Sequence, residues 1–123
     1  MRNKSISKYE AGQRGQKEAE AFLEGDGYDI LNRNYRVRTG EIDLIACKGN
    51  YIVFIEVKFR TGLSFGAPSE SVNVAKQQKI THTALHYIAA NNLDSQDFRF
   101  DVVEVLQNDE HILVNHIENA FGA

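Results

Sequence analysis

The segment GEIDLIACKGNYIVFIEVKFR, residues 40–60, constrains the fold more than any other part of the chain. Two apolar runs of strand composition flank Gly49-Asn50, and both of these residue types tolerate the positive φ angles of a two-residue hairpin turn. A turn there places Lys48 opposite Tyr51, so that the numbers of paired residues add up to 99. The sequence therefore predicts an antiparallel hairpin with a defined register.

Four ionisable side chains interrupt the apolar runs of this hairpin. The predicted register places Asp43 opposite Glu56. It also places Glu41 opposite Lys58, and directly opposite residues point to the same side of a sheet. Because most of that face is apolar, we expect the four groups to be partly removed from water. Two carboxylates in this position repel each other, which raises the pKa of at least one unless a cation lies beside them.

Arginines of the same chain are one candidate for this cation. A preceding strand could align Arg36 with Asp43 and Arg38 with Glu41. Those pairs would form a cross-strand ladder of salt bridges. A ladder of this kind would stabilise a scaffold and have no catalytic role.

A divalent metal ion is the other candidate. Mg²⁺ takes one or two protein carboxylates and leaves its remaining positions to water and phosphate oxygens. Lys58 follows Glu56 by two residues on the same face, where its ammonium can hold a scissile phosphate oxygen or act on a water molecule. Together these groups would supply what phosphodiester hydrolysis needs. The residues alone leave both alternatives open.

The basic residues are concentrated in the first part of the chain. Residues 1–80 contain 13 lysines and arginines against 10 acidic residues, whereas residues 81–123 contain one against seven. Four of the arginines surround the hairpin, namely Arg33, Arg36, Arg38 and Arg60. Local positive potential can attract a polyanion even when the whole chain is acidic. These four arginines are therefore candidates for contact with DNA, and the alternative is that they form an ordinary solvated surface.

Apolar spacing and turn residues predict two helices and five strands. The helices are expected over residues 11–24 and from about 72 to near 91, and the strands over residues 28–37, 41–48, 51–59, 98–106 and 112–117. The simplest organisation is one α-β-β-β-α-β-β domain over residues 10–123, preceded by a flexible basic tail over residues 1–9. The fold class predicted is α/β with a mixed sheet.

Composition excludes several classes of protein. Hydrophobic residues make up 42% and charged residues 25% of the chain, as in ordinary globular domains. Neither a long apolar run nor a signal-peptide pattern is present, so we expect a soluble cytoplasmic protein with no membrane partner. The single cysteine, Cys47, excludes an internal disulfide and any zinc site with several cysteines.

The charged hairpin carries a resemblance to a known motif. Gly40-Glu41-Ile42-Asp43 followed by Glu56-Val57-Lys58 resembles the D…ExK motif of the PD-(D/E)xK nuclease superfamily. More of the chain resembles the YraN family of bacterial endonucleases, which is described as distantly similar to archaeal Holliday-junction resolvases. That resemblance rests on GQRGQKEAEAFLEGDGYDIL (12–31), RNYR (33–36), GEIDLIA (40–46), VFIEVKFR (53–60), FGAPSESV (65–72), AKQQKI (75–80), FRFDVV (98–103) and IENAF (117–121).

The resemblance implies a restriction-endonuclease-like fold, with a mixed central sheet and helices on both sides. It also implies that Asp43 and Glu56 bind Mg²⁺ or Mn²⁺ together with the backbone carbonyl of Val57, and that Lys58 is the catalytic lysine. The substrate would be DNA, branched or single-stranded. Since a four-way junction has two-fold symmetry, a homodimer is among the expected partners.

The first helix departs from the pattern of these relatives. They usually begin it with GxxGE, whose glutamate would complete the acidic site, but here Gln16 holds that position. Glu20 lies one turn later on the same helix face and could substitute.

The start of the long second helix, in contrast, matches the relatives. Lys76, Gln77 and Lys79 there could meet a phosphate over the site. The sequence thus favours a metal-dependent endonuclease, and the alternative is a nucleic-acid-binding or adaptor protein that keeps the fold without the catalysis.

Overall fold

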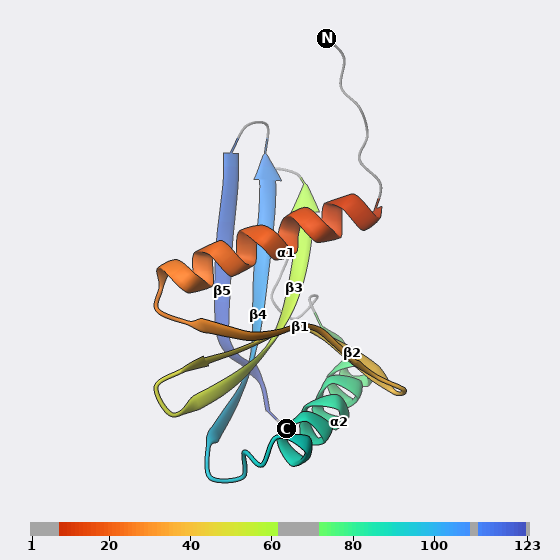
Figure 1. The fold of residues 1–123 in the computed structure, drawn as a ribbon. Helices are drawn as coiled ribbons and strands as arrows, with labels where there is room; N and C mark the ends of the chain where they lie inside the picture. Colours follow the sequence, from red (N-terminus) through yellow and green to blue (C-terminus); the bar gives the residue numbers. More distant parts are fainter. Residues whose placement is uncertain (1–7, 62–71, 109–110, 123) are drawn as a thin grey trace.

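The computed structural model describes residues 8–61, 72–108 and 111–122 of the chain. Its elements are α1 (Lys8–Gly25), β1 (Asp29–Val37), β2 (Gly40–Lys48), β3 (Tyr51–Thr61), α2 (Val74–Ala90), β4 (Asp97–Asn108) and β5 (His111–Phe121), shown in Figure 1. This order confirms the predicted α-β-β-β-α-β-β arrangement and the mixed α/β class of a restriction-endonuclease-like core.

The five strands form one mixed sheet in the order β1-β2-β3-β4-β5. All neighbours are antiparallel except β3 and β4, which run parallel. The connections explain the difference, because short turns join antiparallel strands, whereas α2 carries the chain back between β3 and β4 as a crossover. In Figure 1 the sheet twists so strongly that β1 and β2 run across the direction of β3, β4 and β5.

Helix α1 covers one face of the sheet and crosses in front of β3, β4 and β5 in Figure 1. Ala19 and Leu23 of the helix are fully buried there, against the strand residues Leu44, Ala46, Val53, Ile55, Val103 and Val105. Gly15 allows the helix to approach closely, since a Cβ atom at this position would lie 2.9 Å from the Cβ of Phe59. The helix ends at Gly25, and Gly27, with a φ of 90°, turns the chain toward β1.

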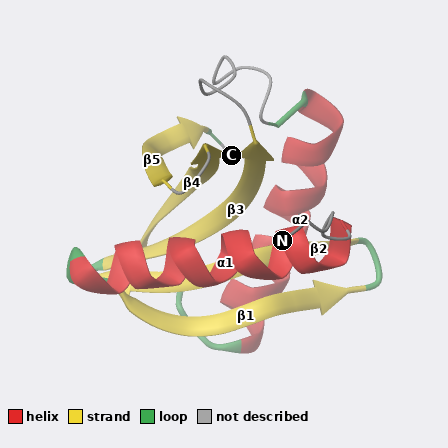
Figure 2. Cartoon of the chain, turned by 90° about the horizontal axis from the view of Figure 1, so that it is seen from above, coloured by secondary structure: helices red, strands yellow, loops and turns green. Residues whose placement is uncertain are grey.

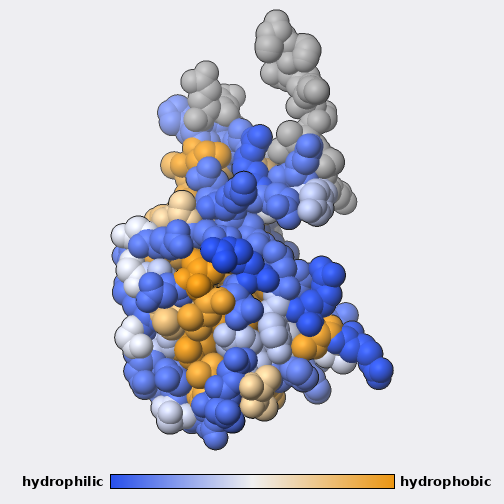
Figure 3. All heavy atoms as spheres, in the orientation of Figure 1, coloured by the Kyte–Doolittle hydropathy of each residue, from blue (hydrophilic) through white to orange (hydrophobic). Residues whose placement is uncertain are grey.

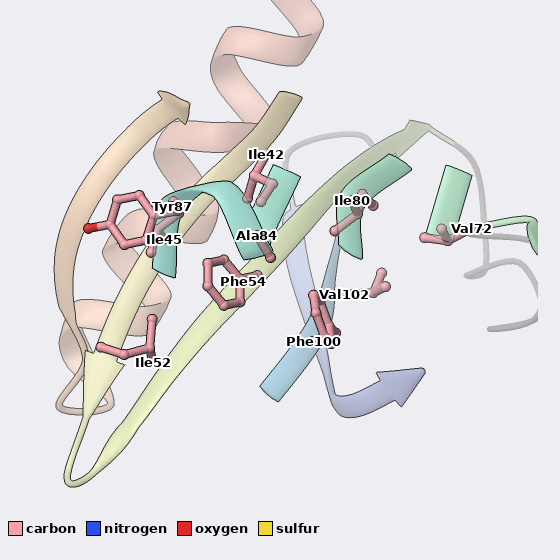
Figure 4. Close-up of a cluster of buried hydrophobic side chains, with 10 residues drawn as sticks. All are labelled: Ile42, Ile45, Ile52, Phe54, Val72, Ile80, Ala84, Tyr87, Phe100 and Val102. Carbon is pink, nitrogen blue, oxygen red and sulfur yellow. The ribbon is translucent and has the colours of Figure 1, made fainter. Parts of the chain in front are cut away.

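Helix α2 packs on the opposite face, so that helices lie on both sides of the sheet (Figure 2). Its buried residues Ile80, Ala84 and Tyr87 contact the sheet, and Figure 4 shows them with Ile42, Ile45, Ile52, Phe54, Val72, Phe100 and Val102. Asn73 caps the helix, because its side chain accepts a hydrogen bond from the backbone N–H of Lys76 at 2.8 Å. The cap fixes where the first turn of α2 begins.

The predicted ends of the helices and strands agree with the structure to within two residues, except at the start of α1 and the end of β5. Helix α1 begins at Lys8, inside the segment assigned to the tail, and residues 1–7 lie outside the described part of the chain. Apolar spacing could not show this, because residues 9–14 are exposed except for the half-buried Ala11 and so form no apolar stripe. Strand β5 continues to Phe121, and its pairing with β4 shifts in register between the Phe100 and Val102 pairs. An irregularity of this kind interrupts the alternation that sequence analysis follows.

A buried ionic cluster, which the sequence did not predict, joins β4 to β5. The carboxylate of Asp101 is fully buried and accepts two hydrogen bonds from Arg99, at 2.9 and 2.8 Å. The ring of His116 lies 2.6 Å from the same carboxylate, and the backbone N–H of Asn119 donates to it at 2.9 Å. Burial alone would raise the pKa of Asp101, but the contacts with His116 and Arg99 outweigh it and lower the pKa. The buried charge of Asp101 is therefore compensated within the protein, and the cluster has a structural role in joining β4 to β5.

The face that carries α1 is predominantly hydrophilic. In Figure 3 hydrophobic residues reach this surface in a narrow band among polar ones. Within the described residues, neither helix is long and apolar enough to cross a membrane.

The close approach at Gly15 gives a test of the fold. Gly15→Ala should lower the free energy of unfolding, because the added methyl group overlaps Phe59. Gly12→Ala, in the same helix, meets no atom within 4 Å and should raise stability by about 1 kcal/mol through helix propensity alone. Urea denaturation should place Gly15→Ala about 1–3 kcal/mol below Gly12→Ala. Equal stabilities would show that α1 does not pack on β3 at this point.

Candidate active site

Strands β2 and β3 separate at the acidic end of the hairpin. Their pairing follows the predicted register from Lys48 and Tyr51 as far as Leu44 and Ile55, where the described ladder ends. Beyond that pair the backbone N–H of Val57 donates to the Oδ2 atom of Asp43 at 2.8 Å. A side-chain carboxylate thus takes the place that a backbone carbonyl of β2 would otherwise fill.

The separation corrects one expectation about side-chain direction. Ile42 packs in the cluster under α2, whereas Leu44 packs in the cluster under α1. Regular alternation would place both on one side, so the strand is irregular at Asp43 between them. The four ionisable groups therefore do not share one regular face, and the expected opposition of Glu41 and Lys58 is not part of the described ladder.

Asp43 and Glu56 nevertheless lie together in the gap between the strands. Both line a small cavity of about 170 Å³, whose walls are Gly40, Glu41, Asp43, Glu56, Lys76, Lys79 and Ile80. Glu56 is only 6% exposed. Burial and the neighbouring charge of Glu56 raise the pKa of Asp43 to about 7. The predicted acidic pair is present, and one of its members binds a proton near neutral pH.

Two lysines face this acidic pair. The ammonium of Lys76, in the first turn of α2, lies 2.5 Å from Oε2 of Glu56, and that of Lys58 lies 4.0 Å from the same atom. Burial lowers the pKa of Lys58, and the nearby charge of Lys76 lowers it further. Burial also acts to lower the pKa of Lys76, but contact with Glu56 outweighs it and raises the pKa. The two lysines thus approach the same carboxylate oxygen, and Lys76 also lines the small cavity.

The proposed arginine ladder does not form as expected. Arg36 pairs with Glu41, at 3.2 Å, rather than with Asp43. Glu41 also accepts a hydrogen bond from Asn34 at 3.1 Å. The salt bridge of Arg36 is thus made with a carboxylate two residues before Asp43, and it does not neutralise Asp43.

Gln16 occupies the helix position where the resemblance described above leads us to expect a glutamate. The side chains of Gln16 and Asn34 exchange two hydrogen bonds, at 2.9 and 3.2 Å. Asn34 adopts a left-handed backbone conformation, with a φ of 52°, which asparagine tolerates better than most residues. Glu20 does not replace Gln16 at the acidic pair, because its carboxylate lies 2.9 Å from Nε of Arg33. Gln16 therefore reaches the site through Asn34 and Glu41.

The remaining predicted residues surround this centre. Some contact other groups of the protein, and others are exposed to solvent. Arg60 contacts the fully buried Glu104 at 3.4 Å, which gives it a structural partner. Gln77 donates to the backbone carbonyl of Val72 at 3.0 Å and so supports the start of α2. Arg38 and Lys79 are exposed. Lys79 lines the small cavity with the acidic pair, and Arg38 lies at the end of the β1–β2 hairpin.

The donor set suits a divalent ion that keeps most of its water. Among the described residues no group of three or more histidine, cysteine, aspartate or glutamate side chains is placed to hold a metal ion, so protein carboxylates could supply only part of a coordination shell. Asp43 and Glu56 can supply two carboxylates, the number that Mg²⁺ typically takes from protein. The N–H and C=O of one strand residue point to the same edge, so the carbonyl of Val57 also faces the gap. Burial, and after it the charge of Glu56, raise the pKa of Asp43, and a cation bound beside this carboxylate would favour its ionised form. These groups fit the ion implied by the resemblance.

Comparisons with known proteins identify related chains. Residues 15–105 match the model of the uncharacterised protein family UPF0102. A UPF0102 protein of Caldanaerobacter subterraneus is 48% identical over 121 residues, covering 96% of this chain and 99% of its own. A UPF0102 protein of Clostridium acetobutylicum is 50% identical over 114 residues, covering 90% and 93%. These names state no activity.

The raised pKa of Asp43 predicts how stability changes with pH. The folded protein binds the proton more tightly than the unfolded chain, so ionisation of Asp43 costs stability as pH rises from about 4 through 7. Asp43→Asn keeps an acceptor for Val57 and avoids this cost. In EDTA, the variant should match wild type most closely near pH 4 and exceed its free energy of unfolding by roughly 2–4 kcal/mol at pH 8.

Asp26→Asn is the matched control, because Asp26 is exposed beside Lys48. Urea denaturation of this variant should follow wild type at both pH values. A gain for Asp43→Asn that did not change with pH would contradict the assignment of a raised pKa to Asp43.

Proposed function

This chain belongs to the uncharacterised protein family UPF0102, the family that the YraN resemblance indicated, and we propose that it is a metal-dependent nuclease that hydrolyses phosphodiester bonds in DNA. The observation that carries the proposal is the meeting of Asp43 and Glu56 with Lys58 and Lys76 in the gap between two strands. Buried acidic pairs are unfavourable unless cations compensate them. A site that keeps a buried acidic pair beside two lysines is suited to a metal ion and a phosphate.

Each residue of the centre has a defined role in this proposal. Asp43, Glu56 and the Val57 carbonyl would hold Mg²⁺ or Mn²⁺. The bound ion would polarise the phosphate and offset the negative charge that develops on it. Lys58 would hold a phosphate oxygen or accept a proton from the attacking water, and its lowered pKa favours the second role.

Lys76 acts as the internal counter-ion of Glu56. Its ammonium is close enough to Glu56 for a charge-assisted hydrogen bond. A lysine has a flexible four-carbon stem, so the group can move from Glu56 toward a phosphate once an ion binds. Lys79, on the same helix, lines the same cavity and adds positive charge.

The charge distribution supports a nucleic-acid substrate. Arg33, Arg36 and Arg60 each contact an acidic residue of the protein, but the side chain of Arg36 is 72% exposed and can still meet a phosphate. Arg38 and Lys79 are exposed as well. These groups attract a polyanion through local potential. We expect branched or single-stranded DNA as the substrate and the cytoplasm as the place of action.

A DNA-binding protein without catalysis is the second candidate function. The observation that favours it is Gln16, which bonds to Asn34 and adds no negative charge to the site. In addition, Lys76 already neutralises Glu56. An ion would then bind weakly or not at all, and the fold would serve binding alone.

Cleavage of a panel of labelled DNAs tests the proposal. Linear, flapped, forked and four-way DNAs should be incubated with Mg²⁺ or Mn²⁺, and at least one should be cut. Lys58→Ala should reduce the rate by about 10²–10³-fold, the usual cost of removing one charge-stabilising group, while DNA affinity stays within a few-fold. Lys48→Ala, an exposed lysine at the other end of the hairpin, should cleave like wild type.

Two results would decide against catalysis at this centre. Cleavage that survives in Lys58→Ala, Asp43→Asn and Glu56→Gln would show that the reaction takes place elsewhere. DNA binding without cleavage in any metal would favour the second candidate, and Asp43→Asn should then tighten binding by removing repulsion between a carboxylate and the phosphates.

A further inference from the structure

A second cavity lies on the α1 side of the gap between β2 and β3. Its volume is about 480 Å³, within the usual range for ligand sites. Its walls are Tyr9, Gly12, Gln13, Gln16, Asn34, Arg36, Glu41, Asp43 and Val57. Glu41 and Asp43 also line the small cavity that holds the acidic pair. The two cavities therefore meet at Asp43, and a ligand in one is next to the reacting centre in the other.

One wall is a side of α1 that ends at Gln16, whose side chain bonds to Asn34 of β1. Tyr9, Gly12, Gln13 and Gln16 are spaced as neighbours along one side of a helix. A Cβ atom added at Gly12 would meet nothing within 4 Å. Tyr9 is 75% exposed at the end of this wall, the largest exposure among the large hydrophobic residues described. An aromatic ring is thus held at the edge of an open cavity.

The opposite wall is polar and carries no net positive charge. Asn34 is fixed between Gln16 and Glu41 by hydrogen bonds. The guanidinium of Arg36, the one basic group among the residues that line the cavity, is paired with Glu41. A phosphate would therefore find no unpaired cation among these residues, whereas an uncharged ring with hydrogen-bonding edges needs none.

We propose that this cavity receives a single unpaired nucleobase of the DNA strand, adjacent to the phosphate at the acidic pair. Tyr9 stacks on the base, and the amides of Gln13 and Gln16 meet its edge. Stacking on an aromatic side chain is a common way to hold single-stranded nucleic acid, because every base has a π-face. The inference rests on the proposed function, and it narrows the substrate to DNA that is unpaired at the site of cleavage.

This assignment explains the position of Tyr9 on the molecule. A large hydrophobic side chain gains little by being 75% exposed near the start of a helix. A base enters from solvent with its face toward the ring. A fully paired duplex would keep the base in its stack and leave the cavity empty.

Binding of oligonucleotides that carry one 2-aminopurine tests the proposal. The full chain is titrated in EDTA, which removes metal-dependent cleavage, with a single strand and with the same strand fully paired. Wild type and Tyr9→Phe should quench the fluorescence of the single strand. Tyr9→Ala should bind it about 5- to 150-fold more weakly, the fold-change equivalent to roughly 1–3 kcal/mol for one stacked base. Affinity for the duplex should hardly change.

Tyr51→Ala is the matched control, since Tyr51 is another exposed tyrosine, 41% exposed at the start of β3. It should bind and quench like wild type. Binding and quenching that are the same in Tyr9→Ala and wild type would overturn the base site alone and leave the nuclease proposal standing. Absence of binding to every oligonucleotide would also overturn the base site, and the cleavage panel in Mg²⁺ or Mn²⁺ would then decide separately on the nuclease proposal.

Discussion

The hydrogen bond from the backbone of Val57 to the carboxylate of Asp43 is the contact on which the site depends. It ends the β2–β3 ladder, because the side chain occupies the place of a backbone acceptor. The described ladder ends there, between helices that cover opposite faces of the sheet, and Figure 2 shows these two helices. The gap contains Asp43 and Glu56 and opens to cavities on both sides. A sheet that stayed paired to its end would bury these groups against one another and leave no room for a ligand.

The two sides of the gap differ in chemistry. On the α2 side the ammonium groups of Lys58 and Lys76 face Glu56, which suits a phosphate and a metal ion. On the α1 side an amide pair, a neutralised arginine and an exposed tyrosine suit an uncharged ring. One DNA strand could therefore present its phosphate to one side and its base to the other. The same geometry accounts for both proposals, but each has its own test.

The hairpin could be predicted from sequence because Gly49-Asn50 fixes its turn, and the turn fixes every pair as far as Leu44 and Ile55. The separation beyond that pair could not, since it depends on a side chain that competes with the backbone for a hydrogen bond. Contact between Lys76 and Glu56 joins residues 20 positions apart and depends on where Asn73 caps α2. Asn34 gave no sequence signal, because its left-handed conformation and its bonds to Gln16 and Glu41 arise only in the folded chain.

The central claim is that the acidic pair in the gap holds a divalent ion. Calorimetric titration of Mn²⁺ into the full chain at pH 7.5, about half a unit above the pKa of Asp43, tests it without DNA or catalysis. The account predicts one bound ion in the wild-type protein, and at least tenfold weaker binding in both Asp43→Asn and Glu56→Gln, equivalent to about 1.4 kcal/mol or more. Absence of Mn²⁺ binding to wild type, or binding that neither substitution weakens, would contradict it.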